Sequence, residues 1–224
     1  MPEEFGLEEQ LSKLVGPVNH TTPVPELRAR IYRKGPFIGR RLLHQLELFA
    51  STSIAVKNEQ PRVLMARMLV ALIPGSLSLI ESYLHTTNVS KETAEMQFSI
   101  FVALSELPAL PIDPQLLSNV TEIVREYLLR IDTHVSQAAW MAGDLLGDHW
   151  PLSLALPVLL DASKAADHVA GREGAIHGLS HALSRTSKPD QWRIIQALKD
   201  IAASDRNESV RRSAEMAMSS LRGL

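Results

Sequence analysis

Prolines recur along this chain at a nearly constant interval, and that spacing limits the folds open to the chain more than any other feature. From Pro36 to Pro74 the interval is 38 residues, from Pro114 to Pro151 it is 37, and from Pro151 to Pro189 it is 38. Proline is tolerated in the first turn of a helix, where its missing N–H has no partner in any case, and it disrupts a helix interior. Each proline therefore marks the start of a helix in a repeating unit, and a repeat of about 20 to 50 residues indicates stacked units.

Capping residues and hydrophobic spacing predict helices at these points. Asp113 precedes Pro114 as an N-cap would, and Ser187 with Asp190 three residues later resembles a capping box. The clearest helix follows Asp113, where apolar residues fall at helical spacing and charged residues occupy the rest of the wheel. Its predicted buried stripe consists of Leu116, Leu117, Val120, Ile123, Val124, Tyr127, Leu128 and Ile131.

Each of the last three units has a second helix that is rich in alanine and glycine. Small residues at these positions let a helix approach its neighbour closely, which stacking requires. The glycines between 171 and 178 follow no predicted strand, so they indicate close helix packing and not a phosphate-binding loop. The three predicted stripes are Val135, Ala139, Ala142, Gly143 and Leu146; then Ala175, Gly178, Leu179 and Ala182; then Val210, Ala214, Ala217, Met218 and Leu221.

Two runs resemble HEAT repeats. The first is similar to HEAT-like repeats of the phycobilisome-lyase type and contains Val135, Ala139, Ala142, Leu146, Gly147, Asp148, Leu159, Leu160 and Asp161. The second, 205–221 with Val210, Arg211 and Ala214, is similar to the second helix of a general HEAT repeat. The resemblance extends from about Leu116 to Leu221 and fades earlier in the chain. It implies an armadillo-like α-solenoid and leaves the biochemistry open.

We therefore expect an all-α chain, an α-solenoid of about five HEAT-like helical pairs. The repeat domain covers 36–224, with units at about 36–73, 74–107, 111–147, 151–185 and 189–222. Residues 1–35 are expected to form an N-terminal cap, because a terminal repeat has an unpaired apolar face. In this cap a short helix runs through Leu7, Leu11, Leu14 and Val15, and a proline-containing linker follows at 16–25.

Charge and composition exclude several classes of function. The 23 basic and 25 acidic residues nearly balance, so the chain as a whole has no field that would attract nucleic acid or an anionic membrane. The absence of cysteine excludes disulfide frameworks, thiolate zinc sites and cysteine nucleophiles. The longest apolar runs are far shorter than the roughly 18 to 20 residues that span a bilayer. With an acidic N-terminus unlike a signal peptide, these features predict a cytoplasmic protein without membrane association.

Polar residues on the second helices predict a surface that binds another protein. Alignment of the last three units places Gln137, Glu173 and Arg212 in one row and Asp144, Ser180 and Ser219 in another. The rows have mixed charge, which favours a protein partner over a uniformly anionic polymer. The leading hypothesis is a non-catalytic adaptor, scaffold or chaperone-like subunit that needs no cofactor. Its candidate binding residues are Gln137, Asp144, Glu173, His177, His181 and Arg212.

A metal site is considered at His177 and His181, whose spacing puts both imidazoles on one helix face. A third ligand would have to come from His168, Glu173 or Asp144. No cysteine and no H-E-x-x-H pattern supports a metal, and the sequence therefore predicts none. HEAT-like deoxyhypusine hydroxylases use His-Glu pairs for iron, and this chain contains no His-Glu dipeptide.

Two alternative functions belong to other classes. One is a nucleic-acid-binding or alkyl-base DNA repair protein of the HEAT-like type, whose candidates are Asp144 with Trp140, Trp150 and Trp192, although Trp140 is expected to be a packing residue. The other is a bilin lyase or chaperone, which the phycobilisome-lyase-like repeats imply.

A basic segment between residues 27 and 46 has two interpretations: it binds anions, or it is a solvated helix end. Its basic residues are Arg28, Arg30, Arg33, Lys34, Arg40 and Arg41.

Overall fold

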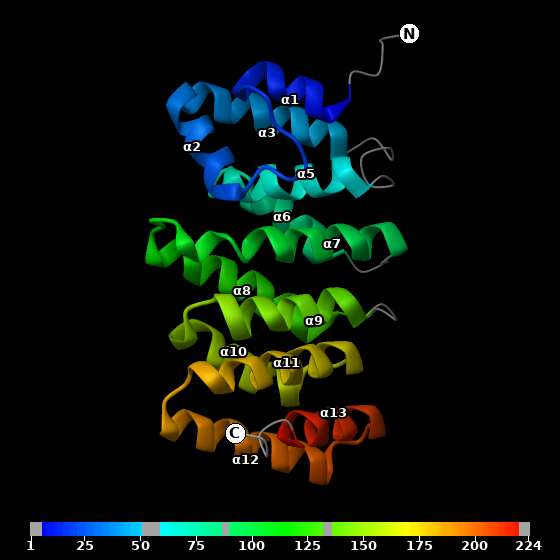
Figure 1. The fold of residues 1–224 in the computed structure, drawn as a ribbon. Helices are drawn as coiled ribbons and strands as arrows, with labels where there is room; N and C mark the ends of the chain where they lie inside the picture. Colours follow the sequence, from blue (N-terminus) through cyan, green and yellow to red (C-terminus); the bar gives the residue numbers. More distant parts are fainter. Residues whose placement is uncertain (1–5, 51–58, 87–89, 132–135, 220–224) are drawn as a thin grey trace. The chain divides into compact units, whose positions relative to one another are not determined.

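The computed structural model describes residues 6–50, 59–86, 90–131 and 136–219, and its regular elements in these ranges are all helices (Figure 1). The expected all-α fold is confirmed. Contacts between the helices define two compact units, an N-terminal one up to Ile112 and a C-terminal one from Asp113 onward. None of the described helices is both long enough and apolar enough to cross a bilayer.

The N-terminal unit is built around α5, which contacts α1, α2, α3, α6 and α7. The bounds of its elements are α1 Leu7–Val15, α2 Val24–Lys34, α3 Pro36–Ala50, α5 Glu59–Ala71, α6 Leu77–Leu84, α7 Lys91–Leu104 and the 3-10 turn η1 Leu107–Ala109. The predicted first helix is present, and α1 packs on α2 and α3.

The sequence-based prediction gave no bounds for the helix α2: it placed a linker at 16–25 and weighed anion binding against a solvated helix end for the basic residues that follow. Its start is set by Pro23 as N-cap and Pro25 in the first turn. Val24, Leu27 and Ile31 recur at helical spacing and are buried. The proline-rich start and the many basic residues obscured this three-residue stripe.

The C-terminal unit consists of three helical pairs. Its elements are α8 Pro114–Arg130, α9 Ser136–Asp144 extended by the π-helical turn η2 Leu145–His149, α10 Leu152–Ala165, α11 Val169–Ala182 with the 3-10 turn η3 Leu183–Arg185, α12 Lys188–Ser204 and α13 Glu208–Ser219. The first helices contact one another in the order α8, α10, α12, and the second helices in the order α9, α11, α13 (Figure 1).

Local capping chemistry starts these helices where the sequence predicts. Asp113 Oδ1 accepts a hydrogen bond from Gln115 N at 2.8 Å, and Ser187 Oγ accepts one from Asp190 N at 3.5 Å. Pro151 is the N-cap of α10. The predicted stripe of α8 is buried from Val120 onward and only partly exposed at its first turn.

Glycines bring α9 and α11 into direct backbone contact. A β-carbon on Gly174 would overlap the backbone of Ala139, and one on Gly143 would overlap the carbonyl group of Gly174. A β-carbon on Gly178 would lie 2.6 Å from the carbonyl oxygen of Gly143. Close helix packing at these glycines is therefore confirmed. Its consequence is that side chains on either side of the α9–α11 contact can reach each other.

Packing on α13 makes a testable prediction about its small residues. Ala214 is fully buried, so Ala214→Phe should lower the free energy of unfolding by about 1 to 3 kcal/mol through overpacking. The neighbouring exposed Glu215→Ala should change it by about 0.5 kcal/mol or less. Urea unfolding followed by tryptophan fluorescence measures both, because all three tryptophans lie in this unit. Equal changes in the free energy of unfolding for the two substitutions would contradict tight packing around Ala214.

Candidate functional site on the second helices

A groove crosses the face formed by α9, α11 and α13. Its volume is about 400 Å³, and the residues lining it include Trp140, Glu173, His177, Ser180, Ser213 and Met216. Trp140 on α9 is 46% exposed and Met216 on α13 is 71% exposed, so large apolar side chains flank the groove from its two outer helices. Because α11 lies between α9 and α13, the groove runs over three successive second helices.

At the end of α9 two histidines meet one carboxylate. Nε2 of His177 lies 2.9 Å from Oδ1 of Asp144, and Nε2 of His181 lies 3.3 Å from the same oxygen. Nδ1 of His181 lies 2.7 Å from Oδ2 of Asp148. The four side chains are between 29 and 38% exposed, so the cluster is accessible from solvent. We call Asp144, His177 and His181 the Asp–His cluster.

Aromatic contacts hold the two imidazole rings in place. The ring of Trp140 stacks on His177 with centroids 5.3 Å apart and an interplanar angle of 26°. His177 and His181 meet edge to face, with centroids 4.7 Å apart. Trp140 is therefore not the core packing residue that its alanine-rich surroundings suggested. It lies on the solvent side of α9, next to the α11 histidine that the glycine contacts bring within reach.

Asp144 is the electrostatic centre of the cluster. Partial burial acts to raise its pKa, but the close contact with His177 and the charges of His177, His181 and His149 outweigh burial and hold the pKa below its usual range. The group is therefore ionised at neutral pH. Solvent does not reach Oδ1, and no aligned hydrogen bond reaches it from the described part of the chain.

The remaining predicted partner-binding residues differ in their positions. Glu173 lines the groove and accepts hydrogen bonds from the hydroxyl groups of Ser209 and Ser213. Gln137 is exposed on α9, and Arg212 is exposed on α13, where it pairs with Glu208 of the same helix. The structure thus brings together Asp144, His177 and His181, places Glu173 in the adjoining groove, and leaves Gln137 and Arg212 outside the groove lining.

Sequence analysis assigned no role to Asp148 and Met216 and considered Trp140 only for base recognition or packing, although each of the three had a signal. Asp148 follows Asp144 by four residues, the spacing that places two side chains on one helical face. Trp140 precedes Asp144 by the same interval. Met216 interrupts the small-residue pattern of α13 at an exposed position. None of these spacings identifies the neighbouring helix that each residue faces.

The predicted basic segment divides into two groups. Arg28 donates to the carbonyl oxygens of Ala71 and Ile73 at 3.2 and 2.7 Å, so it joins α2 to the end of α5. Arg30 donates to the carbonyl oxygen of Pro17 and pairs with Glu26. The other four are exposed around the α2–α3 turn, and anion binding by them stays a prediction: Arg33, Lys34, Arg40 and Arg41.

The three tryptophans considered for base recognition do not gather at one place. Trp150 is fully buried, and its Nε1 donates to Thr121 Oγ1 at 2.7 Å. Trp192 is 68% exposed on α12, among the first helices and away from the groove of the second helices. Of the three, Trp140 alone lies beside Asp144.

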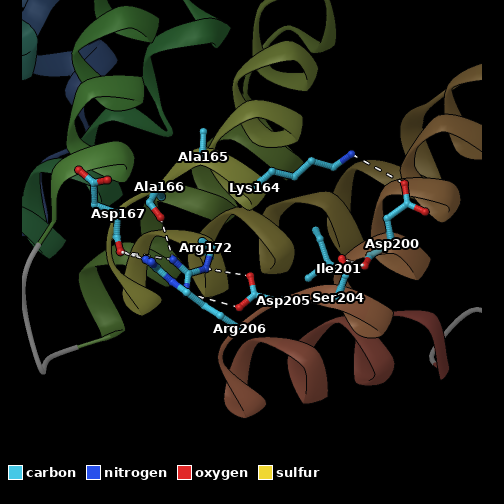
Figure 2. Close-up of a pocket in the computed structure, with 10 residues that line it drawn as sticks. All are labelled: Lys164, Ala165, Ala166, Asp167, Arg172, Asp200, Ile201, Ser204, Asp205 and Arg206. Atoms are coloured by element: carbon cyan, nitrogen blue, oxygen red, sulfur yellow. Dashed lines mark hydrogen bonds and ion pairs between the residues drawn. The ribbon is translucent and has the colours of Figure 1, made fainter.

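A second cavity, of about 620 Å³, surrounds the buried Arg172 (Figure 2). Nε of Arg172 lies 3.0 Å from Oδ2 of Asp205, and Nη1 donates to the carbonyl oxygen of Ala166 at 2.8 Å. Arg206 donates back to the carbonyl oxygen of Asp167 at 2.9 Å. These contacts join the α10–α11 turn to the α12–α13 turn, so the charges here connect two helical pairs.

The same contact recurs one unit later. Arg211 donates to the carbonyl oxygen of Asp205 at 2.7 Å, six residues before it, as Arg172 does to Ala166. Arg172 and Arg211 are 39 residues apart, close to the proline interval. Sequence analysis did not use this correspondence between the two arginines.

Comparison of the chain with family models, with curated proteins and with solved structures gives no match.

Proposed function

We propose that this protein is a non-catalytic protein-interaction module whose C-terminal unit binds a segment of another protein in the groove on α9, α11 and α13. The observation that carries the proposal is the exposure of Trp140 and Met216 on the two sides of that groove. Large apolar side chains at a concave site are the usual anchors of protein interfaces, where tryptophan is strongly enriched. Exposure of these apolar side chains to water is unfavourable, and a bound partner would cover them.

A short α-solenoid is the architecture that we propose for this unit. The support comes from the order of helix contacts, in which first helices contact first helices and second helices contact second helices. Further support comes from Arg172 and Arg211, which make the same contact at corresponding places in successive pairs. A solenoid uses the surface of one helix row for binding, and the groove lies on such a row.

The groove favours a partner segment of defined chemistry. Between Trp140 and Met216 it accommodates an apolar side chain. Glu173 in the lining, and Asp148 exposed near its end, attract a cationic side chain. We therefore infer a peptide segment that has an apolar anchor next to lysine or arginine.

Selection of peptides from a displayed random library on the purified full-length chain tests this function. We expect enrichment of segments with an apolar residue beside a basic one. Trp140→Ala and Met216→Ala should each weaken binding of the selected peptide by about tenfold or more, because each removes an apolar anchor.

Trp192→Ala is the matched control, since it removes a tryptophan that is even more exposed than Trp140, 68% against 46%, from the other row of helices. Binding by this variant should equal that of the unmodified chain. Enrichment of acidic or purely polar peptides, or an equal loss in the Trp192→Ala variant, would refute the proposed groove.

A further inference from the structure

We propose that the Asp–His cluster is a binding site for one divalent transition-metal ion, for which Zn²⁺ is the best fit. The ligand atoms are Nε2 of His177, Nε2 of His181 and Oδ1 of Asp144. This inference goes beyond protein binding and does not rest on it, because the three side chains come from this chain alone.

The ligand atoms have the separations that a metal requires. All three lie within 4.8 Å of one another, and the nitrogens are 2.9 and 3.3 Å from the carboxylate oxygen. Zinc binds histidine nitrogen and carboxylate oxygen at about 2.0 to 2.2 Å in tetrahedral geometry, which puts neighbouring ligand atoms roughly 3.3 Å apart. The two nitrogen-to-oxygen separations are therefore already close to those of a zinc site.

The oxygen at the centre of the cluster lies within 3.3 Å of both imidazole nitrogens. Oδ1 of Asp144 is closed to solvent, and among the described residues no aligned hydrogen bond reaches it, although two imidazole nitrogens lie beside it. Buried polar atoms are rarely left in this state. One carboxylate oxygen close to two imidazole nitrogens is an arrangement that a metal ion can join.

Asp148 supplies the outer contact that metal-binding histidines commonly have. Its Oδ2 lies 2.7 Å from Nδ1 of His181, so Nδ1 carries the proton and donates it. In this tautomer Nε2, which lies 3.3 Å from Oδ1 of Asp144, carries the lone pair that a metal ligand needs. Trp140 holds the second ring, that of His177, by stacking.

Rigid elements position the ligands. His177 and His181 lie four residues apart on α11, and Asp144 ends α9, which the glycine contacts hold against α11. Three protein ligands leave a fourth position for water or an added ligand, as in zinc sites that are open. Mixed imidazole and carboxylate ligands suit Zn²⁺, and also Ni²⁺ or Fe²⁺, better than Mg²⁺ or Ca²⁺, which prefer oxygen alone.

Metal titration of the full-length chain, stripped with a chelator, tests the site. Calorimetry with Zn²⁺ should give one ion per chain, and Co²⁺ should produce the visible absorption of a four-coordinate ion. His177→Ala and His181→Ala should each abolish the Co²⁺ absorption. Asp148→Asn should weaken Zn²⁺ binding by about 10- to 100-fold, since it removes only the outer contact.

His44→Ala is the control, because this exposed histidine on α3 belongs to no ligand set of the described residues. It should bind Zn²⁺ as the unmodified chain does, and circular dichroism should show that every variant is folded. Unchanged Zn²⁺ binding in the His177→Ala variant, or no binding by the unmodified chain, would overturn the proposal.

Discussion

Arg172→Ala is expected to lower the free energy of unfolding of the C-terminal unit by about 3 to 5 kcal/mol. The side chain of Arg172 is 3% exposed and that of Asp205 is 10% exposed, so the substitution leaves a nearly buried carboxylate without its partner. The carbonyl oxygen of Ala166 also loses its donor. Urea unfolding followed by tryptophan fluorescence measures the loss.

The surface pair in the same cavity provides the control. Nζ of Lys164 lies 4.0 Å from Asp200, and both side chains are about half exposed. Lys164→Ala should therefore change the free energy of unfolding by about 0.5 kcal/mol or less. The double substitution Arg172→Met with Asp205→Leu should recover part of the loss, because it removes both charges together. A single Arg172→Ala variant as stable as the Lys164→Ala variant would show that the pair does not hold the two turns.

Gly174→Ala is expected to lower the free energy of unfolding by about 2 to 3 kcal/mol. In an isolated helix this change is favourable by about 0.8 to 1.0 kcal/mol. Here the added β-carbon would overlap the backbone of Ala139, and backbone of a neighbouring helix moves only if the whole helix does. Chemical unfolding followed by circular dichroism shows whether the substitution lowers or raises the free energy of unfolding.

Gly39→Ala is the matched control for helix propensity. Gly39 lies inside α3, and a β-carbon there would lie 3.8 Å from a side-chain carbon of Leu72, an ordinary contact. This substitution should be neutral or raise the free energy of unfolding by up to about 1 kcal/mol. If Gly174→Ala is also neutral or stabilising, α9 and α11 are not in backbone contact.

A displacement of α9 has a second consequence for the Asp–His cluster. Asp144 ends α9, whereas His177 and His181 belong to α11. The Gly174→Ala variant should therefore bind Zn²⁺ more weakly than the unmodified chain even under conditions where it is fully folded. Stability and metal affinity thus report on the same helix contact by independent measurements.

The fold was more accessible from the sequence than the site. Helix starts depend on residues adjacent in the chain, such as Asp113 before Pro114 and Ser187 before Asp190, and these predictions agree with the structure. One exception is Pro74, which lies in the turn before α6 and not in its first turn. Another is α2, whose apolar stripe of Val24, Leu27 and Ile31 is short. A stripe of three residues among basic side chains is a weak periodic signal.

The contacts between residues of different helices in the site could not be predicted from the sequence. The spacing of His177 and His181 predicted that both lie on one face of a helix, and Asp144 was one of three candidates for a third ligand. Choosing Asp144 required the distance between α9 and α11, which depends on the glycines of both helices. The prediction that no metal binds rested on the absence of a sequence motif for metal binding. A ligand set drawn from two helices produces no such motif, so this prediction stays a prediction.

The amino-acid sequence alone determined that this chain is helical, where many of its helices start and which faces are apolar, because propensity, capping and periodicity act between residues within about four positions. Only the tertiary structure decided that one carboxylate faces two histidines and that Trp140 and Met216 flank a groove. Those contacts join residues more than thirty positions apart. The contact of Asp144 with the histidines exists because glycine lets the backbones of α9 and α11 touch, a property of the packed pair that neither helix encodes by itself.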